Sequence, residues 1–346
     1  MNNYTQTQDV LDETDLALID ALQVNPRSSW LQLGDALGIA PITLARRWER
    51  LRNSGAAWVS ITQPPEKSRG AVIELSCTPQ SEMAVARHIA QLPYISTVGI
   101  TTGDYQVYAN LLAPTLSATT HALLQSISLP ADVTRMRSHV FGSMFGGIQW
   151  RLGVLNRAQT DLLRDPAAQS TRQSRPFGPQ DRDLFLALAE DGRRAYTDLA
   201  EELNSSVHGI RRRVRDLLSQ GEITFRCDAA RSLSGWHTMA LLWLSVPDQD
   251  LRTMGKDIST WEETRQCSAV VGAVNLLLIV NLRSFEHLEQ IATRIRDRHP
   301  SAQIVDRRLV IRQVKVYGRL VDQQGRSTHT IPVDAWPPEL LSTNHP

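Results

Sequence analysis

The sequence has few cysteines, and it has no long apolar run. Its three cysteines (Cys77, Cys227 and Cys267) stand apart from one another, and no Cys/His spacing of a zinc site is present. The longest apolar stretch is interrupted at Asn275 and is too short to cross a bilayer. The first ten residues are polar and lack the apolar centre of a signal peptide. We therefore expect a cytoplasmic protein that uses no metal, no other cofactor and no membrane.

Lysine is also scarce, because only three of the 37 basic residues are lysines (Lys67, Lys256 and Lys315) and the others are arginines. The formal net charge is only +1, so the molecule as a whole has no field that would attract nucleic acid. An electrostatic function must therefore rest on local arginine clusters. With 346 residues, of which 42% are hydrophobic, the chain is long enough for two or more domains with cores of their own.

The chain repeats itself. Leu11–Ser60 aligns without a gap on Phe177–Arg226, and eleven of the fifty aligned positions are identical. The two copies lie much farther apart than the units of a solenoid, which indicates duplication of a whole two-domain unit. The identical pairs include Asp15/Asp181, Arg27/Arg193, Arg46/Arg212, Arg47/Arg213 and Gly55/Gly221.

Each copy begins with a pattern of three helices. In the first copy, apolar residues keep helical spacing from Leu16 to Leu22, and a second helix ends near Gly38. Pro41 stands in the first turn of a third helix, where proline is tolerated, and Gly55 is a natural stop after that helix. A short strand follows the third helix in both copies. Three helices and a strand flap are the outline of a winged helix-turn-helix, whose last helix enters the major groove of DNA.

The third helix of each copy carries an arginine-rich stripe beside an apolar stripe. A solvated charged face is the plain interpretation, but arginine can also bind phosphates or guanine edges bidentately. Because the cluster recurs on both third helices, we expect it to bind DNA. Two roles stay open for the arginines that open the second helices, namely contact with phosphate and pairing with a nearby carboxylate. The candidate DNA-binding residues are Thr43, Arg46, Arg47, Arg50, Arg52, Arg211, Arg212, Arg213, Arg215, Arg27 and Arg193.

A strand and helix pattern of the order β-α-β-β-α-β, the ferredoxin-like arrangement, follows each three-helix segment. The predicted fold class is therefore α+β, with two winged helix-turn-helix domains each followed by a βαββαβ domain. The expected segments are a polar tail (1–10), the first helix-turn-helix domain (11–62), the first βαββαβ domain (69–142), a partly helical linker (143–176), the second helix-turn-helix domain (177–227), the second βαββαβ domain (235–318) and a C-terminal tail without periodicity (319–346).

These residues carry a resemblance to a known family. The segments "LDETDLALIDALQVNPR" and "LGDALGIAPITLARRWERLRNSGAAWVS", followed by a βαββαβ pattern with a "TTGDYQ" turn, resemble the Lrp/AsnC transcription regulators. The resemblance implies a sequence-specific regulator that binds double-stranded DNA and responds to an amino acid or a related metabolite. It also implies that one chain equals one family dimer and that the protein forms a homo-oligomer, a dimer of pseudo-dimers.

The sequence departs from the family pattern at several places. The family usually has serine at the helix cap before the proline, where this chain has Ala40, a poorer cap by about 1 kcal/mol. The family's sensing motif typically runs Gly-x-Tyr-Asp, and neither copy has Asp in the fourth place. The candidate effector-binding residues are Thr101, Gly103, Asp104 and Tyr105 in the first copy and Gly272 and Asn275 in the second.

Two other functions compete with an effector-controlled regulator. Siroheme decarboxylases resemble the same fold, and fused two-copy forms occur among them. Their strand pair carries a His-Asn-Tyr-x-Arg type of motif, and this chain contains no His-Asn-Tyr. We therefore expect no enzymatic activity. The other alternative is an architectural DNA-binding protein that responds to no ligand.

Overall fold

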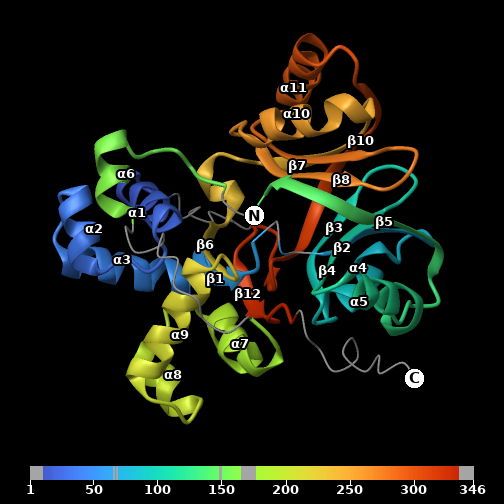
Figure 1. Cartoon of the computed structure of the whole chain (residues 1–346). Helices are drawn as coiled ribbons and strands as arrows, with labels where there is room; N and C mark the ends of the chain where they lie inside the picture. Colours follow the sequence, from blue (N-terminus) through green and yellow to red (C-terminus); the bar gives the residue numbers. More distant parts are fainter. Residues whose placement is uncertain (1–10, 65–66, 68, 148–149, 165–176, 335–346) are drawn as a thin grey trace, which may run out of the picture.

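The computed structural model describes residues 11–64, 67, 69–147, 150–164 and 177–334. A helical part, which holds both helix-turn-helix domains, lies beside a β-barrel whose outside is covered by helices (Figure 1). The polar tail expected over 1–10 lies outside the described residues, as do residues 148–149 and 165–176 of the expected linker.

The two helix-turn-helix domains have the same order of elements. The first comprises α1 (Glu13–Val24), α2 (Trp30–Leu37), α3 (Pro41–Asn53) and β1 (Ala57–Thr62), and the second comprises a short 3-10 turn (Pro179–Asp181), α7 (Arg182–Glu190), α8 (Tyr196–Glu202), α9 (Val207–Ser219) and β6 (Thr224–Ala229). Ala40 makes no capping hydrogen bond at the start of α3, whereas the Ser206 side chain caps α9 by accepting from the Gly209 amide. The three-helix prediction is confirmed for both copies.

Strand pairing joins the two helix-turn-helix domains into one body. β1 and β6 run antiparallel, with Val59 opposite Cys227 and Ile61 opposite Phe225. These four side chains belong to a single hydrophobic core that also takes in buried residues from the helices of both domains and from α6 (Arg157–Leu163). The third helices of both domains, α3 and α9, are therefore held on one rigid support.

Arg27 and Arg193 lock the two domains together reciprocally, which corrects the expectation that they contact phosphate or a carboxylate. Arg27 donates to the carbonyl oxygens of Gly192 and Arg194, at 2.6 and 3.0 Å, and its guanidinium lies over the Tyr196 ring. Arg193 of the second domain donates in turn to backbone carbonyls of the first domain, and its guanidinium lies over the Trp30 ring. Burial and the like charge of Arg27 lower the pKa of Arg193 to about 10. Both guanidinium groups are structural because their donors face the partner domain.

The two βαββαβ units have the predicted order. The first comprises β2 (Arg69–Cys77), α4 (Glu82–Ala90), β3 (Ile95–Thr101), β4 (Val107–Ala113), α5 (Leu116–His121) with a π-helical turn (Ala122–Ser126), and β5 (Val133–Gly146). The second comprises β7 (Thr238–Ser245), α10 (Asp248–Ser259), β8 (Thr264–Val270), β9 (Leu276–Leu282), α11 (Phe285–Arg298) and β10 (Gln303–Val316), preceded by a 3-10 turn (Arg231–Ser234).

The two sheets close into one eight-stranded antiparallel barrel. Their strand orders are β3-β4-β2-β5 and β8-β9-β7-β10, and pairing of β5 with β8 and of β10 with β3 joins them at both seams. The α+β fold class is therefore confirmed. Apolar side chains such as Val72, Phe141 and Leu277 fill the lumen, and two further cores lie between the outer sheet faces and the helices.

Two expected boundaries differ from the structure. β5 continues to Gly146, which pairs with Cys267, so the segment after 142 begins as a strand and not as a linker. The C-terminal segment, which has no periodicity and is expected to be ordered only where it packs on another part, forms β11 (Arg319–Val321) and β12 (Ser327–Thr330). The Ser327 amide donates to the Gly55 carbonyl, and a side chain at Gly55 would collide with the Ser327 backbone. The contact holds this segment against the first helix-turn-helix domain. Hydrophobic periodicity in the sequence could not predict it, because it depends on a residue far away in the chain.

The contacts of Arg27 and Arg193 predict that replacing one of these interface arginines lowers the stability of the fold. Arg193→Met keeps the apolar stem but removes the donors to the carbonyls of Pro26 and Ser28, which lie 2.6 and 3.0 Å from the guanidinium. We expect a loss of about 1–3 kcal/mol in the free energy of unfolding, measured by urea titration. The control Arg212→Met, at an exposed position, should change it by less than about 0.5 kcal/mol. Equal effects of the two substitutions would contradict the lock.

Candidate functional site

The third helices of the two domains, α3 and α9, are the candidate recognition helices and lie in the helical part beside the paired strands β1 and β6 (Figure 1). Each buries its apolar stripe, as the sequence predicts: Leu44, Trp48 and Leu51 in α3, and Ile210, Val214 and Leu217 in α9. The polar face of each helix is therefore turned outward, but its arginines fall into two classes.

One arginine of each helix is held by an aspartate of its own domain. The Arg47 guanidinium lies 2.9 Å from the buried carboxylate of Asp15 and 2.6 Å from Asp12. Its counterpart Arg213 lies 2.7 Å from Asp181, which is likewise buried. Since both partners recur in both copies, these pairs fix the recognition helix on the first helical segment of its domain. They position the helix, and their guanidinium groups are not free for DNA.

Other candidates on α3 are partly neutralised. Arg50 lies 2.7 Å from Asp15, and Arg52 lies 2.9 Å from Glu49 and 3.2 Å from Asp191. Both arginine side chains are nevertheless about half exposed. They can reach a phosphate only in competition with these carboxylates.

The remaining arginines face solvent. Arg46, its counterpart Arg212, and Arg215 are exposed and form no ion pair with the described residues. Arg211 is exposed and lies over the Tyr196 ring, 5.4 Å from its centroid. Thr43 is also exposed at the start of α3. The structure thus leaves the Arg46/Arg212 pair as the shared, unpaired cation of the two recognition helices.

The predicted effector turns of both copies meet at one end of the barrel. A side chain at Gly103, in the β3–β4 turn, would touch the Arg308 side chain, and one at Gly272, in the β8–β9 turn, would touch the His139 ring. Arg308 comes from β10 and His139 from β5, so each turn lies against a strand of the other unit. The two turns therefore border one shared cluster and not two separate sites.

The centre of this cluster is Glu74 on β2, whose side chain is fully buried. Arg137 donates to it at 2.6 and 2.9 Å, Arg308 donates to its other oxygen, and the His139 Nε2 atom lies 3.4 Å away. Burial alone would raise the pKa of Glu74, but His139 and the charges of Arg308 and Arg137 lower it to about 2. Glu74 is therefore ionised at neutral pH.

Aromatic rings cover the cluster. The Tyr105 ring lies 4.4 Å from the Arg137 guanidinium, and the Trp243 ring lies 4.6 Å from the His139 ring. The backbone carbonyl of Tyr105 also accepts from Arg308. Arg137 remains 40% exposed, so it is a cation of the cluster that a dissolved ligand can reach.

The predicted effector residues have different places in this arrangement. Gly103, Tyr105 and Gly272 border the cluster, and the Thr101 hydroxyl supports the turn by donating to the Tyr105 carbonyl. Asp104 is exposed on the turn itself. The expectation that Asn275 binds an effector is corrected, because its side-chain amide forms two hydrogen bonds with the backbone of Val246, at 2.7 and 2.9 Å. It fastens strand ends together and does not face the cluster.

Glu74, Arg137, His139 and Arg308 were not among the sequence candidates. The signal for Glu74 is present, because it is an acid within the buried strand Arg69–Cys77. Arg137 and His139 come from β5, which pairs with β2 in the same sheet and places Arg137 opposite Glu74. Arg308 comes from β10 of the other unit, and closure of the barrel brings it to Glu74.

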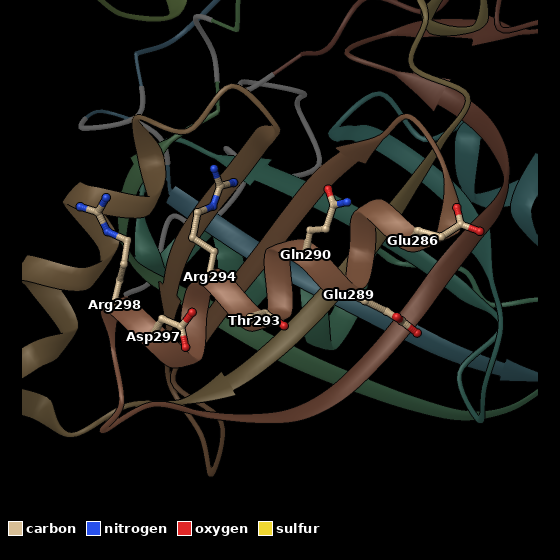
Figure 2. Close-up of a pocket in the computed structure, with 7 residues that line it drawn as sticks. All are labelled: Glu286, Glu289, Gln290, Thr293, Arg294, Asp297 and Arg298. Carbon is tan, nitrogen blue, oxygen red and sulfur yellow. The ribbon is translucent and has the colours of Figure 1, made fainter.

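A hollow also lies along the exposed face of α11, lined by side chains of that helix alone among the described residues (Figure 2). Arg294 is tied there to Glu263 at 2.7 Å and lies over the Trp261 ring, while Arg298 lies 2.8 Å from Asp257. These contacts fasten α11 to the rest of its unit. Within the described residues we find no cluster of three potential metal ligands and no helix long and apolar enough to cross a membrane.

Two segments of the chain match known domain families. Residues 11–52 match the AsnC-type helix-turn-helix domain, and residues 239–320 match the Lrp/AsnC ligand binding domain. The chain carries Lrp/AsnC-type DNA-binding and ligand-binding domains. The first match covers α1 to α3 in the first copy, and the second covers the barrel strands and helices of the second copy.

Individual proteins show the same likeness. The chain is 27% identical over 99 residues to the HTH-type transcriptional regulator LysM of Saccharolobus solfataricus, covering 28% of this chain and 70% of that one. It is 25% identical over 111 residues to an uncharacterised HTH-type transcriptional regulator of Pyrococcus furiosus, covering 32% of this chain and 75% of the relative.

Two solved structures resemble the whole chain. Both are of the siroheme decarboxylase NirDL, one of them in co-complex with an iron-uroporphyrin III analogue. The TM-scores are 0.56 and 0.57, and 96% of this chain aligns with 99% of NirDL, at 15% and 13% identity. At such identity the likeness establishes the two-unit fold alone.

The ionised Glu74 predicts a pH-dependent contribution to stability. Glu74→Gln removes the buried anion that Arg308 and Arg137 share and leaves Arg308 with Asp306, at 2.9 Å, as its carboxylate partner. The substitution should cost about 3–5 kcal/mol at pH 7. Because the folded-state pKa lies below the ordinary value of 4.5, the wild-type advantage should be complete above pH 4.5 and decline as the pH falls toward 2. Urea unfolding of both proteins from pH 7 to pH 3 measures the difference, with exposed Asp104→Asn as control. A difference that stays constant over this range would contradict the ion cluster.

Proposed function

We propose that this protein is a DNA-binding transcription regulator in which one chain supplies both recognition helices. The observation that carries the proposal is the repeated pattern on α3 and α9: an inner arginine paired with a buried aspartate beside an outer arginine that is exposed and unpaired. Such a pattern fixes the helix and leaves a cation for DNA phosphate or for guanine. The helix-turn-helix match and the regulators among the relatives support it.

We further propose that the Glu74 cluster is the effector site. A carboxylate ligand arriving from solvent meets the half-exposed Arg137 beside the Tyr105 ring, and it would compete with Glu74 for that guanidinium. An amino-acid-like metabolite carries such a carboxylate. The Lrp/AsnC ligand-binding match supports a small-molecule effector.

We propose that the chain acts by binding and not by catalysis. The whole-chain likeness to NirDL favours an enzyme as the second candidate, and the buried His139 and Arg308 would be its polar groups. Against it, the chain has no His-Asn-Tyr motif, and Glu74 already engages both arginines of the cluster.

Binding to DNA should depend on the outer arginines and on salt. Each phosphate contact contributes about 0.9 to the slope of log K against log salt, so Arg46→Ala with Arg212→Ala should lower the slope by roughly 1.8. Fluorescence anisotropy of a labelled genomic duplex between low and high salt measures it. The control is Arg157→Ala, which removes an exposed arginine of α6. Affinity that does not change with salt, or an equal effect of the control, would contradict DNA binding through these helices.

Ligand titration separates the three functions. A regulator with an effector should show a rise in melting temperature with one or more of the twenty amino acids, and Arg137→Gln should abolish that rise while Arg135→Gln retains it. A shift of the siroheme absorbance spectrum on addition of protein, with release of carbon dioxide, would instead establish the enzyme. If neither amino acids nor siroheme bind but DNA does, the protein is an architectural DNA-binding protein, and the assignment of the Glu74 cluster as an effector site is wrong.

A further inference from the structure

The recognition helices differ most at their exposed starts. Ile42, the second residue of α3, is 62% exposed and packs in no hydrophobic core. The corresponding residue of α9 is His208, which is exposed as well. Folding does not require an isoleucine at such a position, and the first residues of a recognition helix are those that contact base edges.

The two helices also differ in free charge. On α3 only Arg46 is exposed and unpaired among the described arginines, because Arg47, Arg50 and Arg52 have carboxylate partners. On α9 three arginines face solvent without a carboxylate partner in the described structure: Arg211, Arg212 and Arg215.

The difference extends to the acids. Where α9 has the exposed Arg215, α3 has Glu49, which is exposed and pairs with Arg52. α9 has one acid of its own, Asp216, where α3 has Arg50. Because carboxylates pair with three of the four arginines of α3 and with one of the four on α9, the outer face of α3 is closer to neutral and that of α9 is more basic. A neutral face with an apolar side chain suits bases, and a basic face suits phosphates.

We infer that the two recognition helices divide the work, with α3 reading thymine methyl groups through Ile42 and α9 holding the phosphate backbone through Arg211, Arg212 and Arg215. This inference rests on the proposed DNA-binding function. Thymine presents a methyl group in the major groove, where an apolar side chain can contact it and exclude water. Three unpaired guanidinium groups on one helix supply an attraction that does not depend on sequence.

The division predicts an operator with two unlike halves. The half-site under α3 should contain a fixed thymine, and the half-site under α9 should be less constrained in sequence. The full chain is used to select duplexes from a random library, and the selected consensus shows whether the two halves differ. A symmetric consensus would overturn the inference.

Replacing thymine by deoxyuridine in the selected duplex tests the methyl contact directly. Loss of one buried methyl group should weaken binding of the wild type about fourfold when the replaced thymine lies in the α3 half-site. The Ile42→Ala protein should not distinguish the two duplexes, and His208→Ala should behave as the wild type. Equal binding of thymine and deoxyuridine duplexes by the wild type would overturn the role of Ile42.

The salt slope tests the charge division. Replacing Arg211, Arg212 and Arg215 by glutamine should lower the slope by about 2.7, and Arg46→Gln should lower it by about 0.9. Equal changes would overturn the division while leaving the proposed function in place. Absence of any DNA binding by the folded wild type would refute the proposed function itself, and with it the inference.

Discussion

Antiparallel pairing between the two copies of the duplicated unit is the constraint from which the other features follow. The pairs β1–β6, β5–β8 and β10–β3 join one copy to the other at the helical part and at both barrel seams. Because a slip of one residue would turn every buried side chain outward, the register is strongly fixed. It packs α3 and α9 into one core and brings the β3–β4 and β8–β9 turns to one end of one barrel.

Duplication within one chain also permits asymmetry that identical subunits cannot have. On β6, the buried Arg226 and Asp228 form a bidentate pair, and Arg226 lies over the Tyr317 ring at the end of β10. Burial would raise the pKa of Asp228, but the charge of Arg226 and its hydrogen bond lower it to about 2. The equivalent places on β1 hold the uncharged side chains Ser60 and Thr62, so this buried ion pair belongs to the second wing and has no counterpart at these two positions of the first.

This joint gives a physical route between the two halves of the molecule. Arg265, at the start of β8, also contacts Asp228, at 3.2 Å. A ligand that shifts the barrel strands at the Glu74 cluster would therefore act on a wing strand that is paired with β1 and supports both recognition helices. The same buried charges that hold the parts together are well placed to transmit a change between them.

Local patterns in the sequence predicted the helices, the strand order and the apolar stripes, because each depends on neighbours within one element. They could not sort Arg46 from Arg47, since the two lie on one polar stripe and only the folded domain shows that Asp15 reaches Arg47. Arg27 was misjudged for the same reason, as its acceptors are carbonyls of the other domain. The Glu74 cluster depends on the register of β2 against β5, which places Arg137 opposite Glu74, and on closure of the barrel, which brings in Arg308 from the other unit. No spacing rule in the sequence predicts either contact.

The number of chains on one operator tests most directly whether a single chain holds both recognition helices on DNA. Native mass spectrometry of the full protein on a selected duplex, combined with footprinting, counts chains and protected half-sites together. One chain should protect two half-sites, and further copies should add half-sites in pairs. If two half-sites require two chains, each binding through one helix-turn-helix domain, the paired recognition helices do not act as a unit.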